Sequence, residues 1–99
     1  RWRLIVLDNA SQAENRPKRS DLPQGAKLIQ SDTNLGFAEG NNTAAHGVTT
    51  PYLVFLNPDA FPEPAWLGAL FDTIERFPEA AAVGSTQLRA DEIEIGKVT

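Results

Sequence analysis

Short apolar runs alternate with polar or helix-like stretches along this chain, and this alternation constrains the fold more than any other feature. The runs lie at Leu4–Leu7 and at residues 26–30, 52–56 and 80–84. Each is too short for a helix and is typical of a strand that is covered on both faces. Such alternation predicts an α/β fold, with a mostly parallel sheet, flanking helices and right-handed crossovers.

The segments between these runs predict helices of unequal quality. Residues 12–24 are polar and contain two prolines, which indicates a poor helix or a loop. Residues 35–46 predict a helix that stops at Gly47. Residues 63–77 form the clearest helix, with Pro64 in its first turn. One face of that helix carries Trp66, Leu67, Leu70, Phe71, Ile74 and Phe77. Residues 87–98 alternate weakly and indicate either a hairpin or a fraying end.

Composition bounds the function classes. The chain has 99 residues, which predicts a single domain over residues 1–99. Its net charge of −4 argues against nucleic acid as a partner. The absence of cysteine excludes disulfides and thiolate metal sites. No apolar run approaches the roughly 20 residues of a membrane span, and no signal peptide is visible. Because the chain has no methionine, we expect it to be either processed or cut from a longer protein.

Polar clusters follow the three best strand candidates. They are Asp8-Asn9-Ala10-Ser11, Asp32-Thr33-Asn34 and Asn57-Pro58-Asp59. In an open parallel sheet, ligands bind outside the carboxyl ends of the strands, so the clusters are expected to share one rim. Each cluster alone is more typical of an ordinary turn than of a site. Their number favours a binding site, in which Asp8 and Asp59 face a common hollow.

Asp59 is the strongest single candidate for a metal ligand. Its carboxylate, with the amide oxygen of Asn57 two residues earlier, suits a hard divalent cation that also keeps waters and substrate phosphates. Gly36 and Gly40 let backbone approach a diphosphate, although the spacing is not a dinucleotide fingerprint. The alternatives are a solvent-facing turn carboxylate and a glycine-rich turn packed by Leu35 and Phe37. His46 is expected to be a surface residue.

The motifs VLDNAS, NLGFAEGNN, YLVFLNPDAF and PEAAAVGSTQL, in this order, resemble the inverting family 2 glycosyltransferases. The resemblance covers about residues 4–88, and it is closest to the rhamnosyltransferase-like bacterial members. It implies a GT-A fold, a nucleotide-diphospho-sugar donor, an acceptor sugar or lipid-linked sugar, Mn²⁺ or Mg²⁺, and a role in polysaccharide biosynthesis. It also implies a cytoplasmic location, with membrane association of the full-length protein.

Carried over residue by residue, the resemblance assigns the candidate site. Asp8 and Asn9 would contact the nucleoside, and Asn34, Gly36 and Asn41 would line the nucleotide side of the cleft. Asp59 would bind the metal, with Asn57 in place of the family's first acid. No residue matches the catalytic base.

Relative to the family pattern, the first strand and the helix after it are missing. We therefore expect a partial donor-binding domain that is inactive alone and whose exposed strand edges favour a homo-oligomer. The alternatives are a non-catalytic nucleotide-binding or assembly module of the same fold, and a nucleotidyltransferase.

Overall fold

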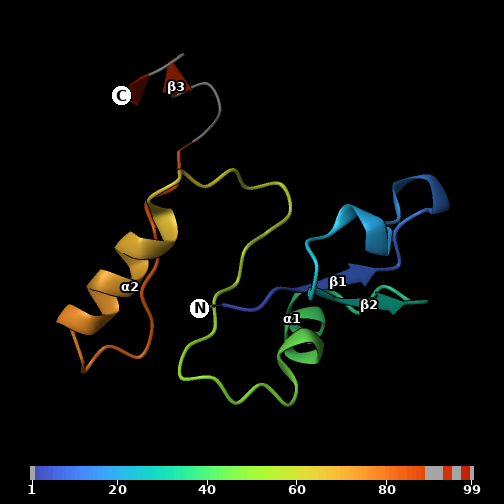
Figure 1. The fold of residues 1–99 in the computed structure, drawn as a ribbon, viewed down its shortest axis with the longest axis horizontal. Helices are drawn as coiled ribbons and strands as arrows, with labels where there is room; N and C mark the ends of the chain where they lie inside the picture. The colour runs from blue at the N-terminus through green and yellow to red at the C-terminus, as the bar shows by residue number, and fades with distance from the viewer. Residues whose placement is uncertain (1, 89–92, 95–96, 99) are drawn as a thin grey trace. The chain divides into compact units, whose positions relative to one another are not determined.

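The computed structural model describes residues 2–88, 93–94 and 97–98, and the chain divides into two compact units, Arg1–Leu56 and Asn57–Thr99 (Figure 1). The first unit contains strands β1 (Ile5–Asn9) and β2 (Lys27–Ser31), the 3₁₀ turns η1 (Ala13–Asn15) and η2 (Arg19–Asp21), and helix α1 (Phe37–Ala45). The second contains helix α2 (Trp66–Arg76) and the short strands β3 (Ile93–Glu94) and β4 (Lys97–Val98). The α/β class expected from the sequence is confirmed.

β1 and β2 pair in parallel, as predicted, and the register sets Leu7 opposite Ile29 and Asp8 opposite Gln30. β1 extends beyond the predicted end at Leu7, so Asp8 and Asn9 lie inside the strand rather than after it. Backbone pairing continues because both polar side chains find partners, as described below. The strand ends at Asn9, and the positive φ of 64° at Ala10 turns the chain out of the sheet.

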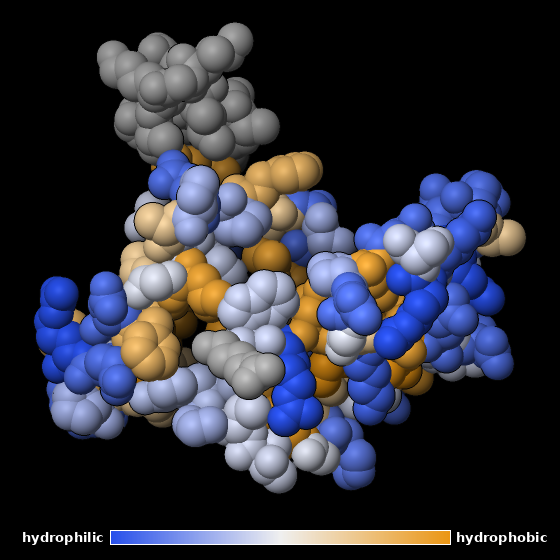
Figure 2. Space-filling view, viewed as in Figure 1, coloured by the Kyte–Doolittle hydropathy of each residue, from blue (hydrophilic) through white to orange (hydrophobic). Residues whose placement is uncertain are grey.

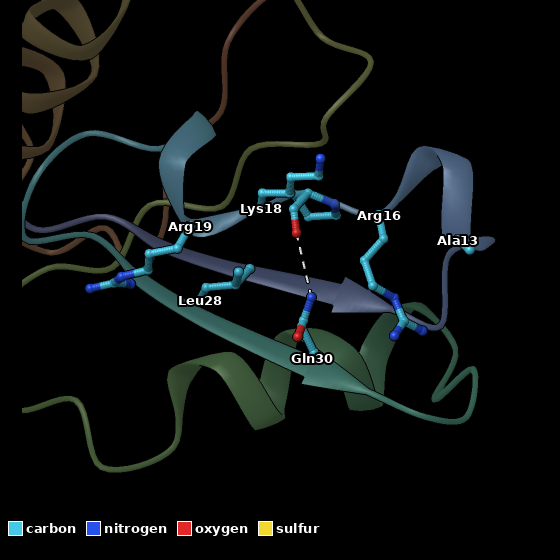
Figure 3. A pocket seen from close by; sticks show the side chains of 7 residues that line it. Ala13, Arg16, Lys18, Arg19, Leu28 and Gln30 are labelled. Atoms are coloured by element: carbon cyan, nitrogen blue, oxygen red, sulfur yellow. Dashed lines mark hydrogen bonds between the residues drawn. The ribbon is translucent and has the colours of Figure 1, made fainter.

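The two faces of this small sheet have different neighbours because successive strand residues point to opposite sides. A β-carbon on Gly40 of α1 would lie 3.6 Å from Leu7 Cδ2 and 3.4 Å from Asn9 Nδ2, so these two side chains face α1. Asp8 and Gln30 instead contact Arg16 and Pro17, between the two 3₁₀ turns. Figure 3 shows α1 and this segment on opposite sides of the strands.

Residues 12–24 contain two separate 3₁₀ turns rather than one helix. Pro17 lies between the turns and Pro23 follows the second. A proline lacks a backbone N–H and crowds the preceding turn, so a continuous helix through this segment is disfavoured.

The strand predictions for residues 52–56 and 80–84 are wrong, since neither segment belongs to a strand. Leu53, Val54, Phe55 and Leu56 are 50–56% exposed. An extended apolar segment becomes a strand only when its backbone pairs with a neighbour, and in the described residues β1 and β2 pair only with each other. Apolar sequence alone therefore did not produce a strand here.

The helix predictions hold with changed boundaries. α1 ends at Ala45, and Gly47 follows with φ of 78°, which is the expected glycine stop. α2 begins at Trp66, three residues later than predicted. Pro64 lies in the turn before it, where the backbone N–H of Trp66 donates to the carbonyl of Glu63 at 3.0 Å.

The predicted apolar face of α2 is only partly covered. Trp66, Leu70 and Ile74 are half-buried, whereas Leu67 and Phe71 are 39% and 49% exposed. Apolar residues show on the surface in this unit (orange, Figure 2). β3 and β4 pair antiparallel, as the hairpin alternative for residues 87–98 expects, whereas residues 89–92 and 95–96 of that prediction lie outside the described residues. Among the described residues no helix has both the length and the apolar character needed to cross a membrane.

Candidate functional site

Asp8 is a buried carboxylate held on the side of the sheet that faces the 3₁₀ turns. Its residue exposure is 3%, and Oδ1 accepts the backbone N–H of Ser11 at 3.1 Å. Arg16 Nε lies 3.2 Å from Oδ2, which accepts no hydrogen bond from any described residue. Hydrogen bonding by Ser11, chiefly from its side chain, holds the pKa of Asp8 below its usual value. The charge of Arg16 lowers this pKa further, against the opposing effect of burial.

Asn9 joins the end of β1 to the loop between β2 and α1. Its Oδ1 accepts the backbone N–H of Leu35 at 2.6 Å, and its Nδ2 donates to the carbonyl of Gly36 at 3.1 Å. Both ends of one amide thus contact a segment 26 and 27 residues away. The side chain fixes this loop at the carboxyl end of β1.

The same loop carries Asn34 and Gly36. Asn34 Oδ1 accepts the backbone N–H of Gly36 at 2.8 Å, which forms a local turn of the kind that asparagine favours. Gly36 has φ of 81°, a left-handed conformation that favours glycine. It caps α1, and the backbone N–H of Gly40 donates to its carbonyl at 3.1 Å.

The start of α1 can contribute to anion binding, but its charge is mixed. The first-turn N–H groups and the helix dipole favour an anion there. Glu39 in the same turn opposes it with an exposed carboxylate. Asn41 follows in the second turn and is half-buried. Backbone groups rather than a strong positive charge would therefore receive a ligand phosphate.

Asn57 and Asp59 lie in an exposed turn of the second unit. The backbone N–H of Ala60 donates to the Asn57 carbonyl at 3.1 Å, so the four residues close a β-turn around Pro58. Neither side chain has a partner among the described residues, which leaves two oxygen groups free to bind a hard cation. No group of three or more His, Cys, Asp or Glu suited to a metal occurs in the described part of the chain. The turn can therefore supply only part of a coordination shell.

The structure gathers some of the predicted residues and separates others. Asn9, Asn34 and Gly36 form one hydrogen-bonded group at the end of β1. Asp8 lies on the opposite face of the sheet from Asn9, although it is adjacent in sequence, because strand residues alternate. Asp8 belongs to the first unit and Asp59 to the second, so the convergence of these two carboxylates stays a prediction.

Arg16 is the residue near this site that sequence reasoning missed. It covers Asp8 and also lines a pocket with its neighbours Lys18 and Arg19 (Figure 3). The only sequence signal was the basic character of residues 16–19. Nothing in that signal indicated which carboxylate Arg16 would reach.

Comparisons with known proteins assign the sequence to a family. No curated protein and no solved structure gives a significant match to the chain. The family model described as glycosyl transferase family 2 matches residues 1–97, which is nearly the whole sequence. The predicted family is thereby confirmed, and the chain belongs to glycosyl transferase family 2.

Proposed function

We propose that this chain forms the donor-binding part of an inverting glycosyltransferase, in the rhamnosyltransferase-like bacterial branch of the family. Family membership already makes sugar transfer the general function, with a nucleotide-sugar donor and an acceptor as substrates, and the α/β arrangement is a partial GT-A fold. The acceptor is a sugar or lipid-linked sugar of polysaccharide biosynthesis. The full-length protein acts in the cytoplasm, associated with the membrane.

One observation carries the proposal for the donor. The loop of Asn34 and Gly36 is clamped by Asn9 at the carboxyl end of β1, where open α/β sheets bind ligands. Because Gly36 has no side chain, a ligand phosphate can approach the backbone there closely. Asn41, one turn further into α1, supplies an amide on the same helix.

Asp8 requires a conformational change before it can contact a nucleoside. Its side chain is fully covered in the ion pair with Arg16. Asp8 Oδ2 lacks a hydrogen bond, so it can accept one from a ligand N–H or hydroxyl once Arg16 moves. The Arg16 side chain is 40% exposed, so it can move away from Asp8 without disturbing the sheet.

Asn57 and Asp59 would hold Mn²⁺ or Mg²⁺ together with the donor diphosphate. The exposed turn offers one carboxylate and one amide oxygen, which fits an ion that takes its other ligands from water and substrate phosphates. When bound, such an ion stabilises negative charge on the departing nucleoside diphosphate. Pro58 fixes its own φ and so stiffens the turn between the two oxygen groups.

Calorimetric titration of the 99-residue chain with uridine diphosphate or deoxythymidine diphosphate, each with Mn²⁺, tests the donor site. We expect binding heat that disappears with a chelator and an affinity at least about tenfold weaker in Asp59→Ala, since a charge-assisted contact is lost. Asp72→Ala, an exposed aspartate of α2 in the same unit, is the matched control and should bind like wild type. Equal heats in all three proteins would contradict the metal assignment.

A non-catalytic nucleotide-binding or assembly module of the same fold is the second candidate. The lone carboxylate of the Asn57 turn and the absence of a three-residue metal cluster in the described ranges favour it. This second candidate predicts that any longer form of the protein binds a nucleotide or a partner without turning over a sugar donor. Because no residue matches a catalytic base, we also expect no sugar transfer from the 99-residue chain alone, and turnover of donor by this chain would refute that expectation.

A further inference from the structure

We propose that a pocket on the first unit, between η1, η2 and β2, binds a small phosphate-bearing anion. The pocket has a volume of about 360 Å³, which lies in the lower part of the range of roughly 300–1,000 Å³ for small-molecule sites. It is lined by Ala13, Arg16, Pro17, Lys18, Arg19, Leu28 and Gln30 (Figure 3). Arg16 also covers Asp8 of the proposed donor site, and the other six lining residues lie outside the proposed donor and metal sites.

The charge of the lining points to an anion. Three of the seven lining residues are cationic and none is acidic. Arg16 is already paired with Asp8, whereas Lys18 and Arg19 have no carboxylate partner among the described residues. The nearest carboxylate in sequence is that of Asp21, and its Oδ2 accepts the backbone N–H of Lys18 at 2.9 Å. Two unpaired cations therefore remain for a ligand.

The floor of the pocket is apolar with one polar group. Leu28 supplies the apolar surface, and Gln30 Nε2 donates to the carbonyl of Pro17 at 3.4 Å, a long hydrogen bond that a ligand oxygen can replace. In Figure 3 the charged ends of Lys18 and Arg19 point in different directions, away from Gln30. Their long stems can turn inward, and an anion with several oxygens can accept from both at once.

A phosphate-bearing small molecule fits these features better than a long polyanion. Phosphate groups offer oxygens in several directions, which suits the ammonium of Lys18 and the planar guanidinium of Arg19. The whole chain carries a net charge of −4, which repels an extended polyanion outside the pocket. Hydrophilic residues gather around η1 and η2 (blue, Figure 2). The three cations of the pocket lie within residues 16–19, so the positive charge is local.

Nuclear magnetic resonance of the full 99-residue chain, titrated with inorganic pyrophosphate without metal, tests the proposal. We expect the Gln30 side-chain amide and the Leu28 methyl signals to shift saturably. In Lys18→Gln/Arg19→Gln the apparent affinity should fall about tenfold, because both unpaired cations are removed. Lys27→Gln/Arg76→Gln removes the same charge outside the pocket and should change the affinity by less than about twofold.

A second arm separates a free ligand from a lipid head group. Vesicles of neutral lipid with and without a phosphatidic acid component are sedimented with the same three proteins. Vesicle binding that requires phosphatidic acid, Lys18 and Arg19 indicates that the natural ligand is a lipid head group. Binding of pyrophosphate without vesicle binding indicates a soluble ligand. Both outcomes support the site. Equal losses of pyrophosphate affinity in the two double variants would overturn the proposal. So would the absence of a signal shift at Gln30 and Leu28. The donor titration is judged by its dependence on Mn²⁺ and Asp59, whereas the pocket is judged without metal by its dependence on Lys18 and Arg19, so the two proposals can fail separately.

Discussion

Asn9→Ala is the sharpest test of how the candidate site is built, because one side chain makes two long-range hydrogen bonds. Its Oδ1 accepts from Leu35 at 2.6 Å in a half-buried position, and its Nδ2 donates to Gly36 at 3.1 Å in an exposed one. Alanine removes both partners and leaves the Leu35 N–H without its acceptor. The change should loosen the loop before α1 while β1 and β2 stay paired.

The magnitude follows from the two bonds. A protein hydrogen bond contributes about 0.5–1.5 kcal/mol net, and the exposed one belongs at the lower end. Together the two bonds contribute about 1.5–2 kcal/mol. Where exchange reports the opening equilibrium, their loss corresponds to a roughly ten- to thirtyfold faster exchange of the Leu35 amide. Native-state hydrogen exchange followed residue by residue measures this directly.

Two further variants make the result specific to Asn9. Asn9→Asp keeps the acceptor for the Leu35 N–H and loses only the donor to Gly36, so most of the Leu35 protection should remain. Asn42→Ala removes an exposed amide from α1 and should leave exchange at Leu35 within about twofold of wild type. The Asn9 side chain does not hold the loop if Asn9→Ala changes exchange at Leu35 by less than about twofold. The same conclusion follows if Asn42→Ala changes this exchange as much as Asn9→Ala does.

Three other predictions concern acid stability, the two glycines of the site and the sheet edges. The pKa of Asp8 lies below its usual value, so its stabilising effect is present above about pH 3.9 and is lost as the pH falls through the lowered folded-state pKa. Asp8→Asn should abolish this acid dependence, and a carboxyl titration by nuclear magnetic resonance that shows a normal or raised pKa would contradict it. Gly40→Ala meets only ordinary contacts at 3.4 and 3.6 Å and should stabilise α1 by about 0.5–1 kcal/mol in urea unfolding, whereas Gly36→Ala should destabilise by about 1 kcal/mol because of its positive φ. Opposite signs would refute the backbone argument. The outer edges of β1 and β2 are unpaired in the described residues, so sedimentation should show self-association at high concentration, and a strict monomer would count against pairing between copies.

Local patterns were sufficient to predict several elements of this fold. The apolar runs near Leu4 and Lys27 became the parallel strands, and Gly47 ended α1 as a glycine with positive φ should. These predictions succeeded because strand and helix signals act over a few residues. The strand expected at residues 52–56 failed for the converse reason, since a strand depends on a partner that the local sequence does not specify.

The functional partners of the polar residues were decided by tertiary structure. The sequence by itself established the α/β class, the family motifs and a list of polar candidates. It placed Asp8 and Asn9 side by side, but the pleat turned them to opposite faces, one toward Arg16 and the other toward Leu35. Those contacts join residues 8 and 26 positions apart through the register of β1 and the folding of the loops. Pairing across such separations depends on chain geometry as a whole, and no local pattern encodes it.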